Sequence, residues 1–107
     1  MQIKKSGTQW IVTPSGYFNS DAGEAVKKIF DDFMLDDSLH FVLNFSEVNL
    51  INSLGLSYLT EILEVLEESD RKLAFCSCSP IIDKTLKLMG MDQYASIHPD
   101  CSELTEL

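Results

Sequence analysis

The chain has 107 residues, 45% of them hydrophobic, and its 17 acidic against 8 basic side chains give a formal net charge of −9. This length and hydrophobic content predict a single folded domain over residues 1–107, large enough for one core. The negative charge would repel phosphate backbones and anionic lipid headgroups. It therefore argues against nucleic acid and membrane-surface binding, and it suits a partner with a basic docking face.

The N-terminal half of the sequence predicts strands around one helix. Gln9–Thr13 has the composition of a strand, a shorter strand over Met1–Lys4 can pair with it, and Pro14-Ser15-Gly16 marks a turn after it. Three helix-capping residue types, Asn19-Ser20-Asp21, then precede apolar residues at helical spacing. We expect a helix from that point to the acidic cluster Asp36-Asp37.

The C-terminal half predicts strands alternating with helices, followed by a short terminal helix. In chain order the elements are a strand over Phe41–Phe45, a helix from about Gly55 to Ser69, a strand over Leu73–Cys78, a helix from Ser79-Pro80 to Gly90 and a strand over Tyr94–Ile97. Ser79 can cap its helix, Pro80 suits the first helical position, and Gly90 suits the left-handed position after the last turn. This alternation predicts an α/β domain with a mixed sheet of four to five strands and three to four helices.

The sequence gives no sign of export or of a membrane anchor. No apolar run approaches the ~20 residues that a membrane-spanning helix needs, and the N-terminus lacks the pattern of a signal peptide. The three cysteines, Cys76, Cys78 and Cys101, are odd in number and lack the spacing of a disulfide framework. We therefore expect a cytoplasmic protein with reduced thiols.

The residue pattern contains no credible catalytic set, metal site or cofactor loop. We expect Cys76 and Cys78 to point to opposite faces of their strand, so that they cannot grip one ion, and no C-x-x-C or H-x-x-x-H pair is present. The glycines stand alone rather than in a phosphate-binding loop. A thiol enzyme that uses Cys78 or Cys101 stays open as an alternative, although the spacing places neither histidine beside a thiol.

The stretch Asn52-Ser53-Leu54-Gly55 indicates a functional site at the start of the long amphipathic helix. In the simplest interpretation Ser53 caps the helix by accepting a backbone hydrogen bond, which is worth ~1 kcal/mol. Gly55 favours a second interpretation, because glycine in a helix costs ~1 kcal/mol relative to alanine. A glycine at this point would let a partner's backbone or a nucleotide phosphate approach Ser53 closely.

Three segments, in the same order, resemble the STAS family of anti-sigma factor antagonists over about residues 8 to 98. PSGYFNSDAGEAV resembles the family's first turn and helix, and FVLNFSEVNLINSLGLSYL resembles its strand-and-loop signature. RKLAFCSCSPIIDKTLKLMGMDQY resembles the late strand, the Ser-Pro helix start and the glycine-containing turn. The resemblance implies a STAS-type fold.

The resemblance also implies that Ser53 is phosphorylated by an ATP-binding serine kinase that doubles as the anti-sigma factor. The unphosphorylated antagonist would bind this kinase, phosphorylation would end the binding, and a serine phosphatase would reverse the modification. Asn52 matches the family's loop aspartate, Leu54 its second small hydroxyl residue and Gly55 its glycine. The expected partner-binding surface comprises Asn19, Asn52, Ser53, Leu54, Gly55 and Leu56.

The expected protein is thus a bacterial, cytoplasmic, monomeric regulator of transcription that works by partner switching, with no enzymatic activity, cofactor or metal. Asn19 and Asn52 depart from the family pattern, which prefers aspartates there, and an amide lacks the charge of a carboxylate. A STAS subunit of a transporter or other regulatory complex, with Ser53 unmodified, therefore stays open as an alternative.

Overall fold

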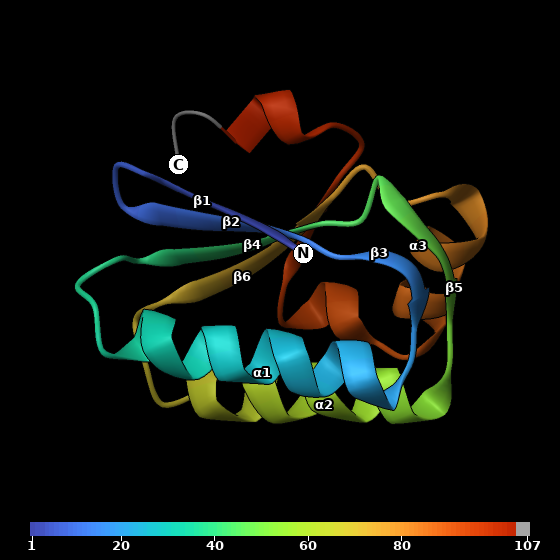
Figure 1. The fold of residues 1–107 in the computed structure, drawn as a ribbon, viewed down its shortest axis with the longest axis horizontal. Coiled ribbons are helices and arrows are strands. Elements are labelled where there is room, and N and C mark those ends of the chain that lie inside the picture. Colours follow the sequence, from blue (N-terminus) through green and yellow to red (C-terminus); the bar gives the residue numbers. More distant parts are fainter. Residues whose placement is uncertain (105–107) are drawn as a thin grey trace.

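The computed structural model describes residues 1–104 and contains a five-stranded sheet in the order β1-β2-β4-β6-β7 (Figure 1). The strands are β1 (Gln2–Ser6), β2 (Gln9–Thr13), β4 (His40–Asn44), β6 (Lys72–Cys76) and β7 (Ser96–His98). β1 runs antiparallel to β2, whereas β2, β4, β6 and β7 are parallel to one another. The predicted mixed sheet is confirmed.

Helices cover one face of this sheet and contribute to one main core. They are α1 (Ser20–Met34), α2 (Ser53–Leu66) and α3 (Pro80–Leu88). Each helix lies in the connection between two neighbouring parallel strands, where a crossover is required. Two short 3-10 turns follow, η1 (Met91–Gln93) and η2 (Cys101–Leu104), and η2 lies on the side of the sheet opposite to α1 and α2 (Figure 1).

β4 is buried on both faces, as its apolar run predicts. Phe41 and Leu43 belong to the main core beneath the helices, where the ring centroids of Phe30 and Phe41 are 5.3 Å apart in an edge-to-face arrangement. Such aromatic pairs are favourable beyond the area that they bury. Val42 faces the other way and forms a small second cluster with Ala74 and the side chain of Cys76. The two faces of the sheet therefore have apolar layers of very different size.

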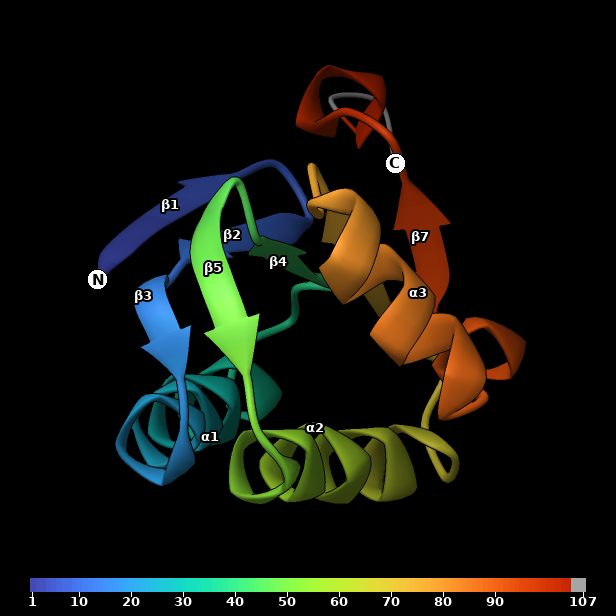
Figure 2. The ribbon, with the colours of Figure 1, turned by 90° about the vertical axis from the view of Figure 1, so that its right-hand side faces the viewer.

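Two short segments that we expected to be a turn and a connector instead form a second, parallel sheet. β3 (Ser15–Phe18) pairs with β5 (Glu47–Ile51) (Figure 2). Pro14 and Gly16 gave a turn signal, and Gly16 does adopt a left-handed φ of 77°, but this φ accompanies a register shift within β3. The pairing joins segments that are far apart in the sequence, so local patterns did not reveal it.

Several element boundaries differ from the predictions by a few residues. α2 begins at Ser53 rather than near Gly55 and ends at Leu66. The Ser79-Pro80 start of α3 is confirmed, since the Ser79 hydroxyl accepts a hydrogen bond from the Ile82 N–H at 3.4 Å. The predicted domain of residues 1–107 includes positions 105–107, which lie outside the described residues. Within the described part of the chain, no helix is long and apolar enough to cross a bilayer.

Candidate functional site

Asn52, and not Ser53, caps helix α2. The Asn52 Oδ1 accepts a hydrogen bond from the Gly55 N–H at 2.8 Å, and the Asn52 backbone is extended, as is usual for an N-cap. Ser53 is the first residue of the helix itself, and its side chain is exposed. The capping role that we expected for Ser53 is therefore wrong. Its hydroxyl makes no hydrogen bond within the part of the chain that the structure describes.

Gly55 is buried against the chain's own strand β3. A Cβ at this position would collide with the carbonyl oxygen of Phe18 and would lie 2.8 Å from the ring Cδ1. The same carbonyl accepts a hydrogen bond from the Asn52 N–H at 3.2 Å. The close approach that Gly55 allows is thus between β3 and α2. It is not the approach of a partner that the sequence suggested.

The small sheet brings Asn19 next to Asn52. Phe18 and Ile51 are paired in the register of β3 and β5, so that Asn19 and Asn52 follow at the same edge. The Asn19 Oδ1 caps α1 by accepting a hydrogen bond from the Ala22 N–H at 3.1 Å. α1 and α2 therefore begin side by side (Figure 2) and run in the same general direction (Figure 1). The structure brings the two asparagines together as the predicted surface requires.

The exposed part of the site differs in membership from the predicted surface. Gly55 and Leu56 are buried, so they are not part of the exposed surface of the free protein. Leu54 is 57% exposed beside Ser53. The neighbouring side chains of Tyr17 and Leu50, which are paired in the register of β3 and β5, are 45% and 54% exposed.

We call Tyr17, Leu50, Ser53 and Leu54 the Ser53 surface. Tyr17 and Leu50 were not among the predicted site residues, because their strands have the local sequence pattern of a turn and a connector. The signal that was present is Val48, a buried apolar residue between the exposed Glu47 and Asn49. Such alternation is typical of a half-buried strand.

The start of α2 is electrostatically unbalanced. The first turns of α1 and α3 contain Asp21 and Asp83, whereas the first turn of α2 contains no acidic residue. The N-terminal N–H groups and the aligned peptide dipoles place a partial positive charge at a helix start. An anionic group attached to Ser53 would lie at this charge and would be stabilised by it.

The cysteines do not provide the thiol nucleophile that the sequence left open. Cys76 and Cys101 form a disulfide, which corrects the expectation of three reduced thiols. Burial, with a smaller contribution from Asp83, raises the pKa of the free Cys78 thiol to about 11. A reactive cysteine needs a thiolate at neutral pH, so Cys78 has the wrong environment. Among the described residues, no group of three His, Cys, Asp or Glu side chains is placed to hold a metal ion.

Cys76 and Cys78 lie on different sides of the sheet, but strand alternation is not the reason. Cys76 belongs to the small second cluster, and Cys78 packs against the main core. Residues two apart on a regular strand share a face. Here β6 ends at Cys76, and Ser77 adopts a left-handed conformation with φ 56°, which redirects the chain before Cys78.

Comparison with known protein families identifies the family of this chain. A model of the STAS domain matches residues 1–104, and the chain therefore belongs to the STAS domain family. A search of curated proteins found no match to the chain.

Solved structures share this fold. A proposed anti-sigma factor antagonist from Thermotoga maritima is 25% identical and has a TM-score of 0.86, with 98% of this chain and 91% of that chain covered. A sulfate transporter family protein from Wolinella succinogenes is 18% identical and has a TM-score of 0.83, with 96% of this chain and 87% of that chain covered. The anti-sigma factor antagonist SpoIIAA in its unphosphorylated form is 17% identical and has a TM-score of 0.73, with 98% of this chain and 92% of that chain covered. SpoIIAA from Bacillus in its phosphorylated form also matches, with a TM-score of 0.75 and 13% identity. The predicted STAS-type fold is confirmed.

Proposed function

We propose that this protein is a partner-switching regulator of the anti-sigma factor antagonist type, controlled by phosphorylation of Ser53. The observation that carries the proposal is the division of roles at the start of α2. Asn52 caps the helix and leaves the Ser53 hydroxyl exposed and unbonded within the described residues. A serine that served only the helix would make the capping bond itself. SpoIIAA, which has the same fold, has been solved with and without its phosphate.

A phosphate on Ser53 would change binding without a change of fold. It adds about −1.5 to −2 charges and three acceptor oxygens, and the unbalanced N-terminus of α2 accommodates them within the free protein. In a docked complex the same group would be a desolvated charge against contacts made for a neutral hydroxyl. A penalty of ~3 kcal/mol already lowers the affinity more than a hundredfold.

The proposed partner is an ATP-binding serine kinase that docks on the Ser53 surface. Apolar contact area for a partner comes from the exposed side chains of Leu54, next to Ser53 in the chain, and of Tyr17 and Leu50, which are paired where β3 and β5 approach the helices. The net charge of −9 favours a partner with a basic docking face. A serine phosphatase would restore the binding form. The antagonist itself would act as a monomer in a bacterial cytoplasm, where its output would be transcription and its role regulatory rather than enzymatic.

The test is a parallel affinity capture from host lysate with the wild-type protein, Ser53→Asp and Ser57→Asp as baits. Ser57 is a matched control, because it is an exposed serine one turn further along α2 whose hydroxyl donates a hydrogen bond to the Leu54 carbonyl at 2.7 Å. We expect wild type and Ser57→Asp to retain a serine kinase and Ser53→Asp to lose it. Mass spectrometry of the recovered wild-type bait should find phosphate on Ser53.

Equal capture by all three baits, together with an unmodified Ser53, would contradict the proposed switch. A transporter subunit recovered in that case would support the alternative, a STAS subunit that binds constitutively. We include this outcome because a sulfate transporter family protein from Wolinella succinogenes has the same fold.

A further inference from the structure

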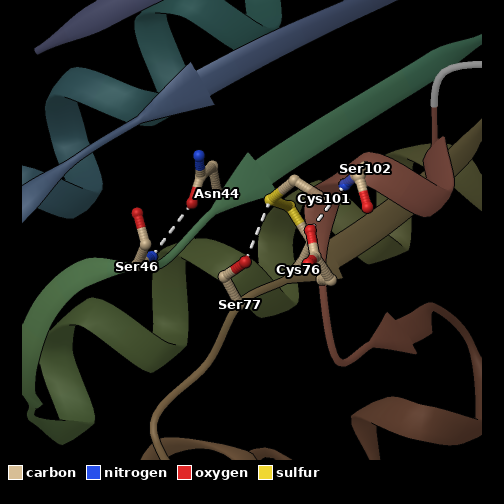
Figure 3. The surroundings of a disulfide bond; sticks show 7 residues. Asn44, Ser46, Cys76, Ser77, Cys101 and Ser102 are labelled. Atoms are coloured by element: carbon tan, nitrogen blue, oxygen red, sulfur yellow. Dashed lines mark hydrogen bonds between the residues drawn. A yellow bond between two sulfur atoms is a disulfide. The ribbon is translucent and has the colours of Figure 1, made fainter.

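The disulfide between Cys76 and Cys101 ties the turn η2 to the end of β6. The two cysteines are 25 residues apart in the sequence, and their Cα atoms are 4.9 Å apart (Figure 3). Cys76 is fully buried, whereas Cys101 is partly exposed. Cys101 is therefore the more accessible of the two cysteines.

The segment held by this bond covers the face of the sheet opposite to the helices. We call residues 99–104, which include η2, the C-terminal segment (Figure 1). The small cluster of Val42, Ala74 and Cys76 packs against Ile11 and Cys101. Val42 is fully buried although the helices lie on the other face. The C-terminal segment therefore contributes Cys101 to the apolar layer on this face of the sheet.

An open hollow of about 610 Å³ lies beside the bond. Its lining includes Cys101 and Ser102 on the C-terminal segment and Ile11 and Thr13 on β2. The hollow has room for a small thiol to approach the sulfur of Cys101. Cys78 cannot replace that thiol from within the chain, because it packs against the main core on the other side of the sheet.

The residue that follows Cys76 has a strained backbone conformation. Ser77 is the one non-glycine residue with positive φ in the described part of the chain. Its hydroxyl lies 3.4 Å from the Cys101 Sγ, and its N–H donates a hydrogen bond to the His98 carbonyl at 3.2 Å (Figure 3). Strained residues persist where the surrounding structure holds them, and they occur at switch regions. Opening the disulfide would remove one of the constraints on Ser77.

We propose that the Cys76–Cys101 bond is a thiol–disulfide exchange site, at which a dithiol reductant opens the bond and frees the C-terminal segment. The first thiolate of the reductant attacks the Cys101 Sγ and forms a mixed disulfide, while the S–S bond breaks and Cys76 leaves as a thiolate that takes up a proton. The second thiolate of the reductant attacks the reductant's own sulfur in the mixed disulfide. Cys101 is released and protonated. The protein gains two electrons and two protons, and the dithiol becomes a disulfide.

The biological setting of this site, though not its chemistry, rests on the cytoplasmic location proposed above. Disulfides of cytosolic proteins are usually transient and serve redox sensing or catalysis. Ser53 and the C-terminal segment lie on opposite sides of the sheet (Figure 1). The failure of either proposal would therefore be seen in its own experiment and would leave the other standing.

The first experiment counts thiols. Protein purified without reductant and unfolded in iodoacetamide should gain one adduct, at Cys78, and after treatment with dithiothreitol it should gain three. In reduced Cys76→Ser, which lacks the thiol that would displace glutathione again, glutathione disulfide should place glutathione on Cys101, and in reduced Cys101→Ser it should leave Cys76 unmodified. Three adducts without reductant, or glutathione on Cys76, would overturn the proposal.

The second experiment measures amide hydrogen exchange in the native protein. Dithiothreitol should speed amide exchange of residues 100–104 at least tenfold and leave α2 unchanged. Cys78→Ser should respond as wild type does, and Cys101→Ser should exchange rapidly with or without reductant. Unchanged exchange on reduction would show that the bond does not hold the segment. Wild type alone answers this question if Cys101→Ser does not fold.

Discussion

At the scale of single residues, Asn52 determines how the Ser53 hydroxyl is presented. Asn52→Asp keeps the acceptor of the 2.8 Å hydrogen bond and adds a charge at the helix start, so we expect a gain of ~0.3–1 kcal/mol in the free energy of unfolding. Asn52→Ala removes the cap and should lose ~1 kcal/mol. Urea unfolding followed by circular dichroism measures both changes. Equal stability of the two variants would contradict the capping role.

Gly55 gives a second prediction at the residue scale. Gly55→Ala should gain ~1 kcal/mol of helix propensity, yet the new Cβ would collide with the Phe18 carbonyl and push β3 away from α2. We expect a net loss of ~1–3 kcal/mol in the free energy of unfolding, as for other overpacked sites. Ser57→Ala, an exposed change on the same helix, is the control and should have little effect. If both variants unfold at the same urea concentration, Gly55 has no packing role.

At the scale of elements, Asp36 joins the end of α1 to the sheet. Its Oδ2 accepts hydrogen bonds from the Ser38 hydroxyl at 2.8 Å and from the Trp10 Nε1 at 3.0 Å. The hydrogen bond from Ser38 has the larger effect and that from Trp10 the next, and both lower the pKa of the Asp36 carboxyl below its usual value. The resulting stabilisation is complete above the pKa of the unfolded chain and is lost as the pH falls through the lower pKa of the folded state.

The expected consequence is a measurable pH dependence. Asp36→Asn should lower the melting temperature at neutral pH and make it less sensitive to acid. Asp37→Asn, at the exposed neighbour, should leave the acid response as in wild type. Fluorescence of Trp10, the only tryptophan, reports the transition. A wild-type acid response in Asp36→Asn would exclude this carboxyl as its source.

Elements with a strong local signal were predicted, and those that depend on distant pairing were not. The apolar run of β4 and the Ser79-Pro80 start of α3 are local patterns, and both appear as expected. β3 and β5 are short, mostly exposed strands that exist through their mutual pairing. Because β5 was not predicted, the cap of α2 was also assigned wrongly: the end of β5 decides whether Asn52 or Ser53 becomes the cap.

At the scale of the whole molecule, no local sequence pattern indicates what covers the second face of the sheet. The helices and the main core follow from apolar periodicity, which a sequence displays directly. The cover instead depends on a contact between Cys76 and Cys101, and cysteine spacing does not reveal such a pairing. Of the predicted partner-binding residues, Ser53 and Leu54 are exposed, whereas Gly55 and Leu56 are buried. The burial of Gly55 and the exposure of Leu50 could not be predicted from local sequence, because both depend on how β3 meets α2.

The strand order also determines how this molecule avoids sticking to its own copies. The outermost strands of the five-stranded sheet are β1 and β7, whose free backbone groups are potential templates for strand addition. β1 is exposed along its whole length and carries Lys4 and Lys5, and β7 has only three residues. Edge lysines and very short edge strands both discourage sheet extension. Growth of the five-stranded sheet by pairing with a second copy is therefore discouraged at both of its edges.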